Sequence, residues 1–201
     1  MKRIIRNSVF ISITVLALVL NSFGGTSSKS IVATQVRIPP KIDGYLNEPE
    51  WQTAVPSTGF TQADPEEGSP ETERTVVRVL YDDNALYVGV WCFDKEPDKI
   101  VSQLTRRDRT GQSDRISIII DSYHDHSTAF LFSGTVSGVQ SDGLLSQDGR
   151  VYDIQWDAVW DFDAQVVGDG WSAEFRIPYN ALRFSDQDSE YVWGINFRRY
   201  V

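Results

Sequence analysis

Apolar and polar side chains alternate with a period of two in the C-terminal part of the chain. Between residues 171 and 177 the odd positions are apolar and the even positions are polar, and residues 191–198 repeat this alternation. Successive side chains of a β-strand point to opposite faces, so one face is expected to pack in a core while Ser172, Glu174 and Arg176 meet water or a ligand. The residues that this pattern places inside are Trp171, Phe175, Trp193, Ile195 and Phe197.

Short strand-like runs separated by Gly, Asp, Asn and Pro make up most of the chain after residue 74. Residues 86–93 are apolar on both faces, as in a central strand. No long stretch keeps a helical period, so helix is expected only as short turns near 48–53 and 178–182. The pattern predicts an all-β fold, an antiparallel β-sandwich of jelly-roll type, with closure into a barrel as the alternative. The expected strands are residues 75–80, 86–93, 115–121, 129–133, 136–140, 161–167, 171–177 and 191–198.

The first residues have the pattern of a secretory signal peptide. Lys2, Arg3 and Arg6 precede an apolar run over residues 9–20, and small or polar residues follow it. As a helix this run is about 18 Å long, well short of a hydrocarbon core of about 30 Å. We therefore expect cleavage after Gly24 or Gly25 rather than a membrane anchor, and an exported protein of the periplasm, outer membrane or extracellular space.

The rest of the chain is expected to be one domain. Residues 1–25 are interpreted as the signal peptide, residues 26–37 as a linker or edge strand, and residues 38–201 as the sandwich. The chain stops within or just after its last expected strand, without a terminating turn. This predicts a sheet truncated at its C-terminus, with one or more strands missing and an unpaired edge.

The net charge argues against some classes of binding partner, and the cysteine content excludes an intrachain disulfide. The net charge is −9 and becomes −12 without the signal peptide, which carries three cations and no acid. Such an acidic surface argues against nucleic acid and anionic lipid. Cys92 is the single cysteine, so no intrachain disulfide can form, and its apolar surroundings predict a buried thiol.

Five segments in order carry a family resemblance, and the chain is similar to carbohydrate-binding module family 9. It most resembles the variant that opens large exported bacterial proteins with a C-terminal domain of outer-membrane type. The five segments are residues 42–51, 79–88, 113–121, 170–178 and 193–198.

The resemblance implies an antiparallel β-sandwich with bound calcium and no catalytic role of its own. It also implies a sugar held between two tryptophans, which this sequence does not reproduce. Residues 110–113 contain no aromatic ring ahead of Asp114, where the first tryptophan of the family lies. The family's acidic and basic sugar-reading residues would fall near Ser117 and Leu131.

An aromatic rim is the predicted local sugar site. Trp156 and Trp160 bracket a short segment after a polar stretch, with Tyr152 beside them, and sugar rings stack on aromatic faces. Arg107 and Asp108 are predicted to hydrogen-bond the hydroxyl groups from an adjoining loop. The alternatives are core packing for the tryptophans and a solvated charge run for the Arg107 region.

The sequence offers one candidate calcium site and no signature for zinc, haem or a nucleotide. Asp121 and Asp125 flank a strand end and are predicted to bind calcium through their carboxylates, with an ordinary Asp-rich turn as the alternative. No third zinc ligand is evident beside His124 and His126. Met1 leaves with the signal peptide, so no Met/His pair remains for haem; neither haem nor a nucleotide is expected.

These observations favour a non-catalytic carbohydrate-binding module of an exported protein that recognises or helps to break down polysaccharide. Two alternatives stay open: a periplasmic docking domain of an outer-membrane protein, and part of a glycoside hydrolase. The expected partners are an oligosaccharide or polysaccharide end, no nucleic acid, and a downstream outer-membrane or catalytic domain in the full-length protein.

Overall fold

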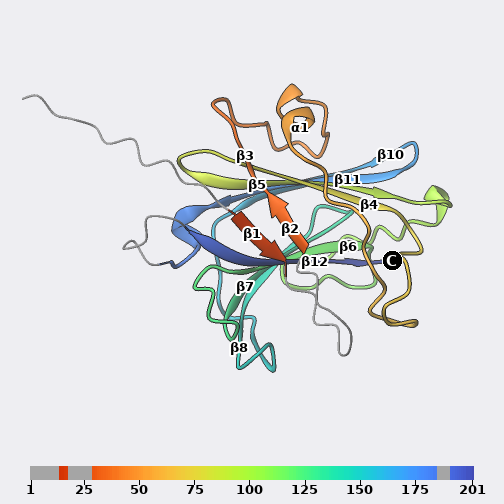
Figure 1. Ribbon diagram of the computed structural model, residues 1–201. Helices are drawn as coiled ribbons and strands as arrows, with labels where there is room; N and C mark the ends of the chain where they lie inside the picture. The colour runs from red at the N-terminus through yellow and green to blue at the C-terminus, as the bar shows by residue number, and fades with distance from the viewer. Residues whose placement is uncertain (1–13, 18–28, 185–190) are drawn as a thin grey trace, which may run out of the picture.

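Two β-sheets pack face to face across an apolar core (Figure 1). The computed structural model describes residues 14–17, 29–184 and 191–201. The seven-stranded sheet has the order β2 (Lys29–Val32), β1 (Thr14–Ala17), β12 (Val192–Tyr200), β6 (Arg115–Asp121), β7 (Ala129–Thr135), β8 (Gln140–Ser146) and β9 (Val151–Asp153). The five-stranded sheet has the order β10 (Asp161–Val167), β11 (Gly170–Pro178), β5 (Ala85–Phe93), β4 (Thr75–Tyr81) and β3 (Thr34–Gln35).

In the described part of the chain, helix is confined to short pieces, as the sequence predicted. The helix α1 covers Pro49–Thr53, and two single 3-10 turns cover Pro97–Lys99 and Tyr179–Ala181. Among the described residues no helix is long and apolar enough to cross a membrane. The antiparallel β-sandwich predicted from the alternation is therefore confirmed.

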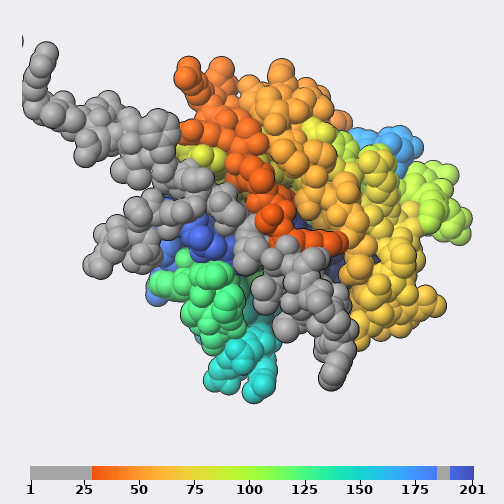
Figure 2. Space-filling view, in the orientation of Figure 1, coloured from red at the N-terminus to blue at the C-terminus, as the bar shows by residue number. Residues whose placement is uncertain are grey.

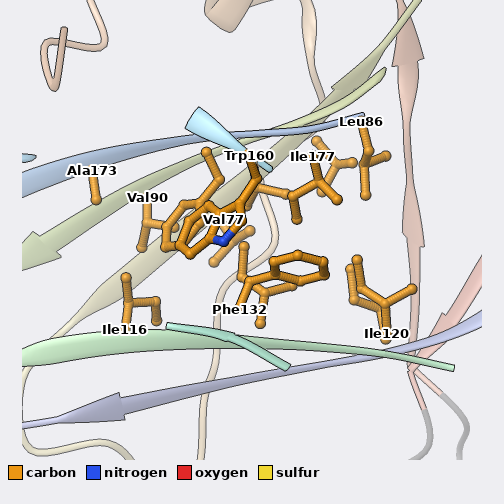
Figure 3. Packing of buried hydrophobic residues seen from close by; sticks show 14 of the residues in the cluster. Val77, Leu86, Val90, Ile116, Ile120, Phe132, Trp160, Ala173 and Ile177 are labelled. Atoms are coloured by element: carbon orange, nitrogen blue, oxygen red, sulfur yellow. The ribbon is translucent and has the colours of Figure 1, made fainter. Parts of the chain in front are cut away.

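The inner faces of the two sheets form the main core. Trp171, Phe175, Trp193 and Ile195 are buried there, and Phe197 packs against it while half-buried. Figure 3 shows side chains from both sheets meeting between the strands. Cys92 also lies in this core, and burial raises the pKa of its thiol to about 12. The predicted core residues and the buried thiol are thus confirmed.

The outer face of the five-stranded sheet is covered, which corrects one prediction. Ser172 and Glu174 are buried rather than exposed to water or a ligand. The Glu174 carboxylate accepts hydrogen bonds from the backbone N–H groups of Asp43 and Gly44 and from the indole N–H of Trp51, each at 2.8 Å. Burial raises the pKa of Glu174 to about 7, against the opposing effect of these donors. The predicted strand register was right, but a second layer covers the polar face.

That second layer is formed by residues 36–54, which include α1 and which we call the covering segment. Trp51, Leu46 and Tyr87 form a separate apolar cluster between this segment and the sheet. In Figure 1 α1 lies on the side of β5 and β11 away from the seven-stranded sheet, and Figure 2 shows the orange residues of the segment spread over the surface there. Gly89 on β5 makes room for it, because a Cβ atom at that position would lie within 2.9 Å of the Trp51 ring.

The strand predicted over residues 136–140 is wrong. These residues form the tight turn that joins β7 to β8, closed by hydrogen bonds from Thr135 N to Val139 O and from Gly138 N to Thr135 O. Gly138 has a φ of +80°, which an extended strand does not adopt. The alternation of small and apolar residues imitated a strand, and β8 instead begins at Gln140.

The N-terminal predictions lie largely outside the described residues. Within the predicted signal peptide the structure describes residues 14–17, which form β1 and pair in parallel with β12 and antiparallel with β2. The segment predicted as a linker or edge strand supplies β2 and β3, each at the edge of a sheet. β12 pairs with β1 on one side and with β6 on the other, and the expected cleavage would remove β1. The truncation of the sheet at its C-terminus stays a prediction.

Candidate functional site

Tyr152 lies on the outer face of the seven-stranded sheet. Its ring covers Gly143 on β8 so closely that a Cβ atom there would come within 2.3 Å of it. The Tyr152 hydroxyl donates to the carbonyl oxygen of Asp142 at 3.2 Å. The side chain remains 44% exposed, so one ring face rests on the strand while the rest of the ring is open to solvent.

Trp156 lies on the opposite face of the same sheet. Its ring centroid is 5.0 Å from that of Phe130 and 5.8 Å from that of Phe132, both of which point into the core. Leu131, which lies between them in sequence, pairs with Gly143 beneath Tyr152. Because neighbouring strand residues point to opposite faces, Tyr152 and Trp156 cannot form one stacking platform.

Trp160 is a core residue, which corrects its predicted place on the rim. It is 4% exposed, and its ring stacks parallel to Phe175 with centroids 5.7 Å apart. The ring of Phe132 meets it edge-on from the other sheet (Figure 3). Trp160 fills the space between the sheets, so its indole faces are not available to a sugar.

Arg107 fastens a loop rather than presenting a free guanidinium. Its Nη1 donates to Gln140 Oε1 at 2.9 Å, and its Nη2 donates to Asp142, to Asp157 Oδ1 at 3.1 Å and to Ala158 O at 3.0 Å. Asp142 is 1% exposed and also accepts a hydrogen bond from the Ala158 N–H at 2.7 Å. The ion pair thus holds residues 157–158 against β8, and Arg107 acts as a structural clamp.

Asp108 does lie next to Tyr152, as the predicted site requires. Its N–H donates to Gln140 O at 3.0 Å and its Oδ1 accepts from the Asp142 N–H at 3.3 Å, so it continues the edge of β8 that β9 leaves open. Partial burial and the nearby Asp108 and Asp142 carboxylates raise the pKa of Tyr152, while a hydrogen bond with Ser141 opposes this. The Tyr152 hydroxyl and Asp108 therefore both lie at the β8 backbone around Asp142, whose own carboxylate is buried in the pair with Arg107.

A row of serines extends this region across the outer face, and the sequence analysis did not find it. Ser117 on β6, Ser133 on β7 and Ser141 on β8 are direct cross-strand partners, and the hydroxyl oxygens of Ser117 and Ser133 are 2.8 Å apart. Ser117 and Ser133 interrupt mainly apolar strands, which was the available signal, whereas β8 around Ser141 is polar. All three serines are buried. Ser117 and Leu131, where the resemblance put the sugar-reading positions, both lie on this face.

The predicted calcium corner is a hydrogen-bonded turn. Asp121 accepts from the N–H groups of Asp125 and His126, and Asp125 accepts from the N–H groups of Ser127 and Thr128. Burial opposes ionisation of Asp125, but these donors outweigh it and the pKa lies below its ordinary value. No group of three or more His, Cys, Asp or Glu side chains is placed to hold a metal in the part of the chain that the structure describes. The corner does not fit a carboxylate-rich calcium site, which needs six to eight oxygen ligands.

The fold and this outer face define a binding module of β-sandwich type. A family model described as carbohydrate family 9 binding domain-like matches residues 42–200, and the chain belongs to this family. The domain is accordingly a non-catalytic carbohydrate-binding module, as predicted. By sequence, no curated protein matches the chain.

Solved structures share the architecture. A family 9 module from Caldicellulosiruptor kristjanssonii with cellotriose gives a TM-score of 0.54 at 17% identity, over 82% of this chain and 73% of that chain. A structure from the same organism with glucose gives 0.56 at 16% identity, over 82% and 74%. A Bacteroides uniformis protein with a proposed role in carbohydrate binding gives 0.60 at 9% identity, over 83% and 81%. At these identities the likeness shows the fold alone.

Proposed function

We propose that this module binds carbohydrate on the outer face of its seven-stranded sheet, at a site that we call the Tyr152 site: Tyr152, Asp108 and the serines 117, 133 and 141. The observation that carries the proposal is the half-exposed ring of Tyr152 on Gly143, beside hydroxyl groups and a carboxylate. The cellotriose and glucose complexes of structurally similar modules support a neutral sugar as the ligand.

The chemistry of the Tyr152 site suits a pyranose. The axial C–H groups of a sugar ring pack on an aromatic face, and the open face of Tyr152 supplies one. The Asp108 carboxylate accepts hydrogen bonds from sugar hydroxyls. The three serines are at most 5% exposed, so they support this face from within the sheet rather than contact the sugar. One ring and a few polar contacts correspond to a dissociation constant between about 1 μM and 1 mM, or about −8 to −4 kcal/mol.

Calorimetric titration of cellotriose and other neutral oligosaccharides tests the proposal with two substitutions at one position. Tyr152→Ala removes the ring and is expected to abolish detectable binding, whereas Tyr152→Phe keeps the ring and is expected to retain most of it. Tyr45→Ala is the matched control, because Tyr45 is similarly exposed at 46% but lies in the segment over the other sheet. Equal affinity of Tyr152→Ala and the wild type would refute the Tyr152 site.

The wider setting is also part of the proposal. The leader-like N-terminus supports export, and the resemblance supports a downstream outer-membrane or catalytic domain to which the module brings a glycan. Fractionation of cells that express the full-length gene tests this: the protein is expected in the periplasm, the outer membrane or the medium, and recovery from the cytoplasm alone would contradict it.

A further inference from the structure

A recess lies where residues 39–42 meet β5, β10 and β11 of the five-stranded sheet and Gln140 at the start of β8. This cleft has a volume of about 550 Å³, within the range of about 300–1,000 Å³ that is typical of small-molecule sites. Its polar lining comes from Arg176 on β11, Asp161 on β10 and Gln140 on β8, and its apolar lining includes Pro39 and Phe162. Five separate parts of the chain therefore meet around it.

The covering segment lines one side of the cleft but leaves Arg176 partly exposed. Ser172 and Glu174 lie on the same face of β11 and are buried beneath that segment, whereas the Arg176 side chain remains 35% exposed. Its Nη1 donates to Asp161 Oδ2 at 2.9 Å, and the Asp161 side chain is 57% exposed. An exposed pair of this kind adds little to folding stability, so its side chains are free to engage a ligand.

The charges select a neutral ligand. A guanidinium beside a carboxylate offers several donors and acceptors within a few ångströms, which suits the vicinal hydroxyls of a sugar. An anionic ligand would meet the Asp161 carboxylate and a chain with a net charge of −9. Phe162 and Pro39 add apolar surface for the C–H groups of a sugar ring.

We propose that this cleft, which we call the Arg176 cleft, is a second saccharide-binding site. The inference rests on the proposed carbohydrate function but uses none of the residues of the Tyr152 site. Gln140 lines the cleft, while its neighbour Ser141 belongs to the serine row on the other face of β8. One chain would therefore bind two sugar units separately, and its affinity for a polysaccharide would exceed that for an oligosaccharide through multivalency.

Titration with cellotriose, xylotriose and mannotriose, followed by backbone amide chemical shifts, tests the cleft. We expect two sets of perturbed amides, one near residues 141–152 and one near residues 39–42, 161 and 176. Arg176→Gln and the milder Asp161→Asn should each remove the second set and leave the first intact. Loss of all dispersed signals in Arg176→Gln would make Asp161→Asn the deciding variant.

The outcomes separate the two sites. If Asp161→Asn and Arg176→Gln change neither set, or if the second set is missing in the wild type, the Arg176 cleft is refuted while the Tyr152 site stands. If Tyr152→Ala changes neither set but Arg176→Gln abolishes the second, the Tyr152 site is refuted and the cleft stands. Binding of none of the three sugars by the wild type overturns both.

Discussion

Replacement of Glu174 by alanine is expected to destabilise the module by about 3 kcal/mol at neutral pH. The substitution leaves three buried N–H groups without their acceptor, those of Asp43, Gly44 and Trp51. An unsatisfied buried donor costs about 1–3 kcal/mol, so three cost roughly 6 kcal/mol at the middle of that range. The loss is partly offset because a costly buried charge is also removed.

The size of that offset follows from the pKa. Burial raises the pKa of Glu174 from 4.5 to about 7, which corresponds to about 3 kcal/mol at about 1.4 kcal/mol per pH unit. Between these two values the folded state holds a proton that the unfolded state has released. The free energy of unfolding therefore falls by up to about 3 kcal/mol as pH rises from below 4.5 through about 7.

Urea denaturation between pH 4 and 8 measures both effects. Glu174→Gln is the matched control, because it keeps the side-chain volume and one acceptor but cannot ionise, so its curve should lack this pH-dependent fall. A loss below 1 kcal/mol in Glu174→Ala, or identical pH dependence in wild type and Glu174→Gln, would refute the reasoning.

Four further predictions concern other regions. Trp160→Ala should lower the free energy of unfolding by about 3–5 kcal/mol in urea denaturation, because it leaves a cavity in the core. A loss below 1 kcal/mol would contradict the core position of Trp160. Arg107→Ala should cost about 3–5 kcal/mol, because it leaves the buried Asp142 carboxylate without its cation, and an unchanged midpoint would contradict the clamp. Chelation is expected to leave the Tm unchanged, because the Asp121 and Asp125 carboxylates already accept backbone N–H groups; a Tm that falls with a chelator and recovers with added calcium would show that calcium is bound. The intact mass of exported protein should lack the first 24 or 25 residues, and a full-length mass would exclude cleavage.

Local alternation was enough to predict much of the fold. A strand has a side-chain period of two regardless of what surrounds it, so residues 171–177 and 191–198 showed which side chains share a face. The predicted core followed directly, and so did the central position of residues 86–93, which are apolar on both faces. The turn at 136–139 escaped this reasoning because a four-residue turn and a short strand can carry the same pattern of small and apolar residues.

The residues of the candidate site were harder to predict from the sequence than the fold. Tyr152 and Trp156 are four residues apart, yet they lie on opposite faces of one sheet because the chain passes around the edge of β8 between them. Ser117, Ser133 and Ser141 come together only through the cross-strand register, which depends on pairing between separate strands. Asp108 was predicted from its charged loop and Tyr152 from its place near Trp156 and Trp160, and only the fold decided that Asp108 and Tyr152 meet.

The sequence by itself determined the sandwich, its strand faces and its family, because these depend on periodicity and on short segments in order. The tertiary structure alone decided which outer faces remain open. The local alternation predicts Glu174 to be a solvent-facing residue of an amphipathic strand. Its hydrogen-bond partners Asp43 and Gly44, however, lie more than a hundred residues earlier in the chain. Two positions further along the same strand, the Arg176 side chain stays 35% exposed although it lies on the same face as Glu174. Burial is a property of the segments that pack above a residue, and no local pattern within the strand encodes it.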